Sequence, residues 1–404
     1  MSSEPSFFPP LPLAGEGRGE GKPLSGDARA GETRAPLPNP LPASRGEGTG
    51  DLPLRFELAC PAPKAETERV LLAHGSGGLL TSQLIEQLVV PAFRNPALEP
   101  LDDQAVLALS PASGGARIAF TTDSYVVTPL FFPGGDIGEL AVNGTINDLA
   151  VGGARPLALS LAFILEEGLP LDDLRRVIAS VQAASARAGV PIVTGDTKVV
   201  GRGAGDKIFI NTSGIGIVPP GIDLSSLRVR PGDAVLLSGS IGDHGATILA
   251  AREGLELGGD LRSDTAALHE LTEAVIEACP DAHAMRDATR GGLAAVLVEI
   301  ASRRKLGIVI DERVIPVSAP VRGACELYGL DPMLLANEGK LVAFVPGAAA
   351  DAVLARMRAH PLGREAVAIG HVSDDGSGRV WIRTALGSRR ILDLPYAEPL
   401  PRIC

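Results

Sequence analysis

Strand-like and helix-like segments alternate along most of this chain, and this alternation constrains its fold more than any other sequence feature. Residues 79–93 space their apolar side chains as a helix does, and 118–122 reads as a strand. A helix follows at 136–151, with Asp136 as its N-cap, and then a buried strand at 157–165. Such alternation predicts α/β layering.

The alternation continues through an amphipathic helix at 171–188 that Gly189 terminates. A linker begins at Pro219, and a second unit starts near Pro231. Further strands are expected at 190–193, 208–217, 234–238, 307–310 and 341–345, and further helices near 264–279, 291–303 and 348–359. We therefore expect two folded domains, 69–219 and 220–385.

The two ends of the chain differ from its middle. The first fifty residues hold nine Gly and nine Pro, a composition that does not repay the entropy of ordering. We predict a disordered extension over 1–68. The last segment, 386–404, is predicted to be a flexible tail, because Pro395, Pro399 and Pro401 exclude a helix interior.

Charge and hydropathy exclude two classes of partner. Among 404 residues the formal net charge is −11, which argues against binding a nucleic acid over a broad face. No apolar run approaches the roughly 20 residues that a membrane helix needs. The four cysteines are scattered without a CxxC pair, so we expect a cytoplasmic protein with free thiols.

Acidic residues recur near the ends of the apolar segments. Asp103, Asp123, Asp148, Asp196 and Asp287 all have this placement. Taken alone, each is more often a helix cap or a turn former. Several carboxylates that converge on one cleft need cations, and Mg²⁺ bridging phosphates is the usual solution. The set therefore indicates a candidate site for a magnesium-bound phosphate compound.

Three other features could take part in such a site. His74, Gly75 and Gly77 lie in a Gly-rich loop that either offers backbone N–H groups to phosphate or is simply a flexible helix start. Lys198 follows Asp196 on an expected strand-end loop and could meet phosphate as a point charge. Glu338, before the strand at 341–345, would be a general base if buried and is otherwise a solvent-facing carboxylate.

Two further residues remain ambiguous from the sequence. His244 lies in Gly242–Gly245, which reads as a loop, and an ordinary loop histidine is favoured over a ligand or proton donor. Cys404 is the last residue, so it does not form a prenylation box, which needs cysteine fourth from the end. Its position is either chance or that of a thiol that carries a covalent group between sites.

Taken together, these motifs resemble the HypE family of hydrogenase maturation factors, within the superfamily of aminoimidazole ribonucleotide (AIR) synthetase and selenophosphate synthetase. The resemblance covers about residues 71–404. It rests on HGSGG at 74–78, DDQA at 102–105, TTDSYVV at 121–127, NDLAVGGA at 147–154, FILEEGLP at 163–170, GDTKVV at 195–200, GDHGAT at 242–247, RDATRGGL at 286–293, ANEGK at 336–340 and PRIC at 401–404.

The resemblance implies a two-domain PurM-like fold of the α/β (α+β) class. The N-terminal domain would bind ATP and pair with a second copy in a homodimer, where strands from both copies form a β-barrel. The implied magnesium ligands are Asp103, Asp123, Asp148 and Asp287. The implied ATP-binding residues are His74, Gly75, Gly77, Asn147, Asp148, Asp196, Thr197 and Lys198.

The implied activity is that of a carbamoyl dehydratase. The carbamoyltransferase HypF would place a carbamoyl group on the thiol of Cys404, and ATP would then activate its oxygen as a leaving group. Lys198 and Glu338 would lie near the carboxamide, with Glu338 as proton acceptor, either alone or sharing that role with Lys198. The product thiocyanate would supply cyanide to iron on a HypC–HypD complex, for a nickel–iron hydrogenase.

Two alternatives stay open at this point. A kinase or synthetase of the same superfamily that acts on a free small molecule would share the aspartates but would have no use for Cys404. A dimeric scaffold that docks maturation partners would need neither the acidic set nor Lys198.

Overall fold

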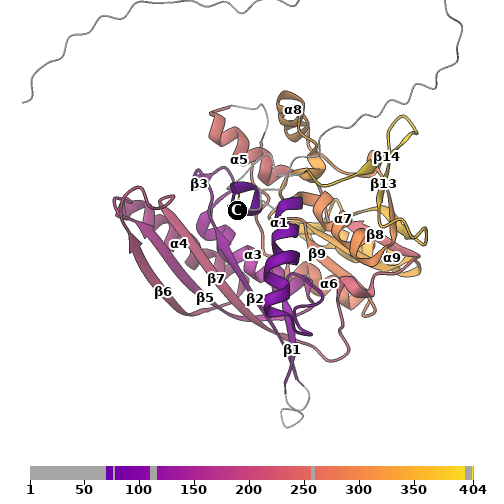
Figure 1. Ribbon diagram of the computed structural model, residues 1–404, viewed down its shortest axis with the longest axis horizontal. Coiled ribbons are helices and arrows are strands. Elements are labelled where there is room, and N and C mark those ends of the chain that lie inside the picture. The colour runs from indigo at the N-terminus through magenta and orange to yellow at the C-terminus, as the bar shows by residue number, and fades with distance from the viewer. Residues whose placement is uncertain (1–69, 76–77, 110–115, 256–259, 396–402, 404) are drawn as a thin grey trace, which may run out of the picture. The chain divides into compact units, whose positions relative to one another are not determined.

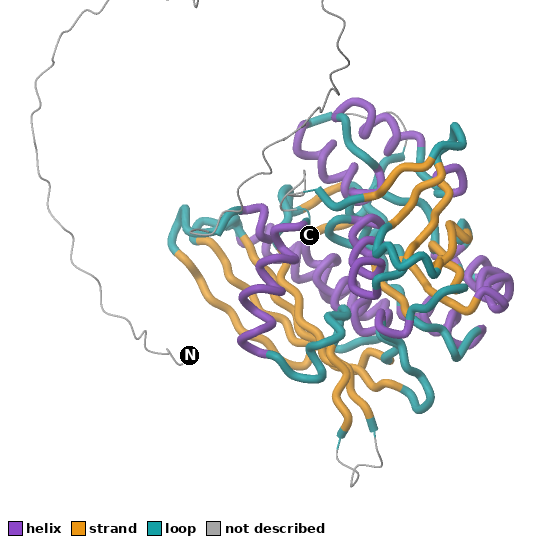
Figure 2. Tube along the Cα trace, turned by 45° about the vertical axis from the view of Figure 1, so that its right-hand side comes forward, coloured by secondary structure: helices purple, strands orange, loops and turns teal. Residues whose placement is uncertain are grey.

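A sheet of five strands forms the first half of the protein. The computed structural model describes residues 70–75, 78–109, 116–255, 260–395 and 403. The strand order is β1-β2-β7-β5-β6, and every pair is antiparallel except β5 with β6 (Figures 1 and 2). The strands are β1 (Ala105–Ala108), β2 (Arg117–Tyr125), β5 (Arg155–Glu166), β6 (Ile192–Val200) and β7 (Ile208–Val218).

Two helices, α3 (Ile137–Val151) and α4 (Leu171–Ala188), form a layer with this sheet, and α3 packs on β2, β5 and β7 (Figure 1). The Asp136 side chain caps α3 by accepting hydrogen bonds from two backbone N–H groups of its first turn. Helix α4 ends at Gly189, whose φ of 68° favours glycine. Both helices match their predicted limits.

The other face of the sheet exposes a row of apolar side chains. Phe120 of β2 pairs with Ile215 of β7, and Ile217 follows two residues along the same face. These side chains are 44%, 40% and 47% exposed, whereas Thr121 on the helix side is buried. The first domain therefore has one helix-covered face and one open face, and this row of apolar side chains lies on the open face.

The second domain is built on a seven-stranded sheet in the order β14-β13-β10-β12-β8-β11-β9 (Figure 1). All its pairs are antiparallel except β10 with β13. Its strands are β8 (Asp233–Leu237), β9 (Ala284–Asp287), β10 (Gly307–Asp311), β11 (Leu341–Pro346), β12 (Val367–Ser373), β13 (Val380–Arg383) and β14 (Arg389–Leu392). Its helices are α5 (Asp243–Glu253), α6 (His269–Ala278), α7 (Gly292–Arg304), α8 (Ala319–Tyr328) and α9 (Ala350–Ala359).

Smaller elements complete the described chain. The helix predicted over 79–93 is present as α1 (Leu79–Leu84), a π turn (Ile85–Val89) and α2 (Val90–Phe93). A short hairpin of β3 (Phe131–Phe132) and β4 (Gly135–Asp136) precedes α3. No helix among the described residues is both long and apolar enough to cross a membrane.

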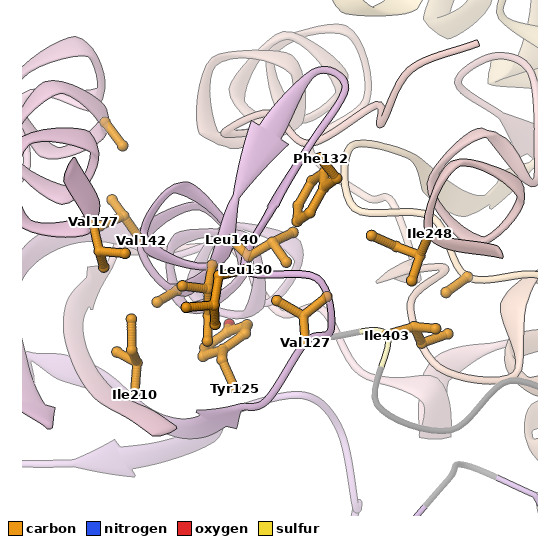
Figure 3. Close-up of a cluster of buried hydrophobic side chains, with 14 of the residues drawn as sticks. Tyr125, Val127, Leu130, Phe132, Leu140, Val142, Val177, Ile210, Ile248 and Ile403 are labelled. Carbon is orange, nitrogen blue, oxygen red and sulfur yellow. The ribbon is translucent and has the colours of Figure 1, made fainter. Parts of the chain in front are cut away.

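Both domains contribute to one buried apolar cluster. Val127 and Phe132 enter it from the first domain and Ile248 enters it from α5 of the second (Figure 3). Ile403, near the end of the chain, belongs to the same cluster and is only 2% exposed. The core thus joins segments that are far apart in the sequence.

Three expectations need correction. Asp196 and Lys198, placed on a loop after a strand, lie within β6, which runs on to Val200. Gly242–Gly245 is the start of α5 rather than a loop. Strand β14 lies inside the segment 386–404 that was assigned to the tail, and it pairs with β13. The extension predicted over 1–68 lies outside the described residues.

Candidate active site

Three aspartates from distant segments meet at one point. Asp103 precedes β1, Asp148 lies in the last turn of α3, and Asp287 ends β9. One carboxylate oxygen from each lies within 4.8 Å of the other two. Because α3 packs against both β2 and β9, the fold itself brings these carboxylates together.

Strand β2 supplies the surroundings of the aspartates. The Thr121 hydroxyl lies 2.6 Å from Asp148 Oδ2 and 2.9 Å from the carbonyl oxygen of Asp103. Two residues on, Asp123 Oδ2 accepts a hydrogen bond of 3.2 Å from the Tyr125 hydroxyl. The charge of Asp123 is felt by both Asp148 and Asp287, so this fourth aspartate lies beside the cluster.

Burial, and secondly the repulsion between the carboxylates, raises the pKa values of the cluster. Burial raises the pKa of Asp103 to about 6, although Arg286, at 2.6 Å, opposes the rise. Burial followed by the charges of neighbouring aspartates raises the pKa of Asp148 and of Asp287 well above the usual range. Carboxylates forced together in this way gain most from a divalent cation.

The donor set fits Mg²⁺. Magnesium prefers hard oxygen ligands and is usually held by one or two carboxylates together with substrate phosphates. Asp103, Asp148 and Asp287 offer such oxygens at one point, and no histidine or cysteine ligand joins this cluster in the described chain. Asp123 is not one of the converging ligands, but its charge raises the pKa values of Asp148 and Asp287.

Glu338 is buried, and hydrogen bonds to its backbone hold it in place. Its side chain is 2% exposed, and Oε1 has no hydrogen-bond partner among the described residues. Asp264 accepts hydrogen bonds from the backbone N–H groups of Glu338 and Gly339. A Cβ at Gly339 would collide with the carbonyl oxygen of Asp264, so the loop needs glycine at this position.

The surroundings of Glu338 make it a strong proton acceptor once it is ionised. Burial raises the pKa of Glu338 well above its usual range, and the charges of Asp264, Asp287 and Asp123 raise it further. Because Asp287 and Asp123 belong to or lie beside the aspartate cluster, Glu338 lies near that cluster. A buried carboxylate with an unpartnered oxygen is suited to act as a general base.

Asn147 bonds to the chain itself. Its amide oxygen accepts a hydrogen bond of 2.7 Å from the backbone N–H of Leu268, and its amide nitrogen donates to the carbonyl of Ala266 at 3.0 Å. These bonds tie α3 to the segment before α6. Asn147 thereby fixes the position of its neighbour Asp148, and its predicted contact with ATP stays a prediction.

The Gly-rich loop lies before a helix, as expected. His74 is in a 3₁₀ turn (Leu72–Gly75), and its Nδ1 accepts a hydrogen bond of 2.9 Å from the backbone N–H of Leu71. Gly75 has open space where a side chain would be, so a ligand could approach its backbone. Gly77 lies outside the described residues.

The residues of the GDTK segment lie apart from the aspartates within one chain. Asp196 and Lys198 form an ion pair of 3.1 Å on the edge strand β6, with side chains 64% and 71% exposed. In the pairing register, Gly195 of β6, which is next to Asp196, is separated from Asp123 of β2 by three strand-to-strand steps, through β7 and β5. At about 4.8 Å per strand this separation is about 14 Å. Thr197 lies between the two charged residues on the same strand.

Sequence reasoning missed three residues at the site. Thr121 and Arg286 were inside recognised motifs, where only the neighbouring aspartates were singled out. Asp264 had no local signal, because its role is to bind the backbone of a loop 74 residues away. Cys404 lies outside the described residues, whereas its neighbour Ile403 is described.

Comparisons with known proteins agree on one family. A model of the N-terminal domain of AIR synthase related proteins matches residues 101–218, and a model of the C-terminal domain matches 230–383. A relative from Cupriavidus necator, named carbamoyl dehydratase HypE, is 54% identical over 336 residues, which are 83% of this chain and 95% of that protein.

Two solved structures are similar over nearly their whole length. A chain from a crystal structure of a HypE–HypF complex has 46% identity and a TM-score of 0.73, and the match covers 77% of this chain and 99% of that one. A crystal structure of HypE in complex with ATP has 49% identity and a TM-score of 0.69, with 83% and 100% covered.

Proposed function

This chain belongs to the HypE family of carbamoyl dehydratases, and on that basis we propose that it converts a carbamoyl group on the thiol of Cys404 into a thiocyanate at the expense of ATP. The single observation that best supports this activity is the buried Glu338 facing the cluster of Asp103, Asp148 and Asp287. This arrangement places a proton acceptor beside a site suited to a magnesium-bound phosphate.

The chemistry needs activation of a poor leaving group. The carbamoyl oxygen attacks the γ-phosphorus of ATP, and ADP leaves. The carbamoyl nitrogen then loses its protons as the C–O bond breaks and phosphate departs, which leaves S–C≡N on Cys404. The elements of water removed from the carboxamide end in the phosphate and the released protons.

Four aspartates would hold the magnesium. Asp103, Asp148 and Asp287 supply the converging oxygens, and Asp123 lies beside them. When bound, Mg²⁺ neutralises charge on the phosphates during phosphoryl transfer. Arg286, paired with Asp103, fixes the orientation of that carboxylate. Backbone N–H groups of the loop that contains His74, Gly75 and Gly77 would contact phosphate, together with Asn147 of the same chain and Thr197 of a second copy.

Glu338 would accept a proton from the nitrogen. Its backbone is anchored by Asp264, so the carboxylate is held in one position before the substrate arrives. Its Oε1 has no hydrogen-bond partner among the described residues, so this oxygen is free to accept a proton. Exclusion of solvent from the buried site strengthens the electrostatic interactions of the Glu338 carboxylate.

Lys198 would act from a second copy of the chain. The open apolar face formed by Phe120, Ile215 and Ile217 supports a homodimer, because a large exposed apolar patch marks an interaction surface. Pairing through this face would bring the partner copy's edge strand toward the site. The partner copy's Lys198 would then meet the transferring phosphoryl group, with its Asp196 as companion.

Three other proteins complete the proposed pathway. HypF would carbamoylate Cys404; the crystal structure of a HypE–HypF complex, one chain of which is similar to this protein, supports this partner. The HypC–HypD complex would receive the cyanide on iron. A carrier thiol has to stay reduced, so the reaction suits the reducing cytoplasm.

Intact mass spectrometry tests the proposed reaction. The purified protein is incubated with HypF, carbamoyl phosphate and magnesium ATP, and a Cys404→Ala variant is treated in parallel. We expect a gain of one carbamoyl group followed by the loss of one water, only when Cys404 is present. ATP consumption without any adduct, in the presence of active HypF, would favour a small-molecule kinase instead.

Hybrid dimers test the placement of Lys198. Lys198→Ala and Glu338→Gln chains carry different affinity tags, and the mixed dimer is isolated. If Lys198 acts across the dimer, one of the two sites in the hybrid is intact, and we expect about half of the wild-type turnover of dehydration. If Lys198 acts within its own chain, both sites are defective and the hybrid is as inactive as either parent.

A further inference from the structure

The penultimate residue of the chain is anchored in the protein interior. The Ile403 side chain is 2% exposed and lies in the buried cluster near Val127 and Ile248 (Figure 3). Val127 follows β2 in the first domain, whereas Ile248 lies on α5 in the second. The Ile403 side chain is therefore buried among side chains from both domains.

A buried histidine binds the backbone of the same residue. His244 is fully buried in the first turn of α5, and its Nε2 lies 2.6 Å from the carbonyl oxygen of Ile403. Its Nδ1 lies 2.8 Å from the Ser263 hydroxyl. The Phe132 ring meets the imidazole edge to face at 5.5 Å. The imidazole thus has a partner at both nitrogens and an aromatic wall.

The hydrogen-bond directions follow from the partners. A carbonyl oxygen only accepts, so His244 Nε2–H donates to Ile403, and Nδ1 accepts from the Ser263 hydroxyl. Ser263 Oγ in turn accepts from the backbone N–H of Thr265. Burial lowers the pKa of His244, which favours this neutral form. Nε2 is therefore the hydrogen-bond donor of the ring and Nδ1 the acceptor.

The segment that orients His244 also holds Glu338. Ser263 bonds to the imidazole, and the next residue, Asp264, binds the backbone N–H groups of Glu338 and Gly339. Ser263 is itself fixed by a backbone hydrogen bond to Pro133 beside the β3–β4 hairpin. The neighbouring residues Ser263 and Asp264 thus connect the two features. Ser263 contacts the histidine that binds the chain end, and Asp264 contacts the backbone of the candidate base.

We propose that His244 and the pocket for Ile403 form a docking contact that holds the end of the chain at the active site, with His244 as a positioning residue for Cys404. The docking contact stands on the geometry alone, whereas its role in dehydration rests on the proposed function. Since Cys404 directly follows Ile403, fixing the backbone at Ile403 restricts where the terminal thiol can be.

Alkylation of Cys404 by iodoacetamide measures docking without any catalytic step. The full-length protein is treated in the absence of nucleotide, and the modification of each cysteine is followed by mass spectrometry. Cys279 and Cys325 are buried and serve as internal controls for the integrity of the fold. An anchored chain end should react more slowly than a released one.

Two substitutions at His244 make a matched pair. In His244→Gln the side-chain amide nitrogen can still donate at the place of Nε2, whereas in His244→Asn the shorter amide can replace only Nδ1. Loss of one buried hydrogen bond predicts about five-fold faster alkylation of Cys404 in His244→Asn. The rate in His244→Gln should stay within about two-fold of the wild-type rate.

Ile403→Ala tests the pocket without altering His244. Loss of the buried side chain predicts about thirty-fold faster alkylation, until the chain end is mostly undocked. Wild-type rates in both His244→Asn and Ile403→Ala would overturn the proposal. Equal rates in His244→Gln and His244→Asn would also overturn it, because they would reduce His244 to a general packing role.

Dehydration of the carbamoylated protein provides the second measurement. We expect His244→Asn to lower the rate about five-fold with unchanged affinity for magnesium ATP, and His244→Gln to restore it. If no variant or wild-type protein dehydrates the group while alkylation follows the expected order, the proposed function fails and the docking contact stands. A change in ATP affinity equal to the change in rate would contradict a positioning role.

Discussion

At the scale of single residues, the aspartate cluster opposes folding while it prepares a binding site. The pKa values of Asp103, Asp148 and Asp287 are raised mainly by burial, so the folded state favours their protonated forms. The stabilisation from these protons is complete below the pKa values of the unfolded chain. It is lost as the pH rises through the folded values, which for Asp103 means about 6.

Asp148→Asn should therefore stabilise the metal-free protein above pH 7. The amide removes one charge and can still accept a hydrogen bond from Thr121. We expect a gain on the order of 1 kcal/mol, which raises Tm by about 2–4 °C at pH 8. The gain should vanish at pH 4, and Mg²⁺ should stabilise the wild type more than the variant. Thermal unfolding with and without Mg²⁺ checks this, and a lower Tm at pH 8 would contradict it.

Glu338→Gln separates chemistry from binding. The amide has nearly the same shape as the carboxyl group but does not accept a proton at neutral pH. We expect dehydration to fall by about 10²-fold or more while the affinity for magnesium ATP stays within about two-fold. Single-turnover assays on carbamoylated protein measure the rate. In the wild type, activity should rise with pH through the raised pKa of Glu338, because the carboxylate is the reactive form. Full activity of the variant would exclude Glu338 as the base.

At the scale of elements, α3 is the part that its own sequence best specifies. The Asp136 side chain accepts from the N–H groups of Gly138 and Glu139, and the helix carries Asn147 and Asp148 at its other end. A helix with a good cap and a continuous apolar run can be recognised locally. That is why 136–151 was predicted within one residue of the observed limits.

Asp136→Ala should cost about 1 kcal/mol of stability through the loss of the cap, and lower Tm by about 2–4 °C. Asp136→Asn retains an acceptor at the same position and should stay close to the wild type. Thermal unfolding of the two variants checks the difference. An equal fall in both would mean that the charge of Asp136, rather than its hydrogen bonds, stabilises α3.

Other elements escaped prediction for physical reasons. Helix α5 is buried over most of its length, so it lacks the polar stripe that reveals an amphipathic helix. The short strands β12 and β13 are specified by pairing with β10 across the sheet rather than by their own composition. Strand β6 was cut short because Gly195 and Asp196 read as turn residues, although pairing with β5 keeps both in the sheet.

At the scale of the whole molecule, the site arises from contacts between distant segments. No local pattern states that Asp103, Asp148 and Asp287 meet, and their convergence was expected only as a set and through the family resemblance. The interior position of Glu338 was likewise left open by the sequence, since burial depends on the packing of both domains. The open apolar face of the first sheet follows from the alternation along β2 and β7, but its exposure is known only from the fold.

Phe120→Arg should prevent the proposed dimer. Phe120 lies at the open face with Ile215 as its cross-strand neighbour, and a charge there is costly to bury. We expect a monomer by size-exclusion chromatography with light scattering, and loss of dehydration if Lys198 acts across the dimer. Leu327→Arg is the control, because Leu327 is also a large apolar residue and is 62% exposed, but lies on α8. A Phe120→Arg variant that still forms the dimer would contradict the proposed interface.

The burial of Ile403 also bears on how the protein is made. Protein synthesis runs from the N-terminus, so Ile403 leaves the ribosome after every other residue of the core that both domains share. This shared core is therefore complete only once both domains and the segment up to Ile403 have been synthesised. A product that ends before Ile403 would lack this contact between the domains. Formation of the interior that both domains share is thus coupled to synthesis of the residue next to Cys404.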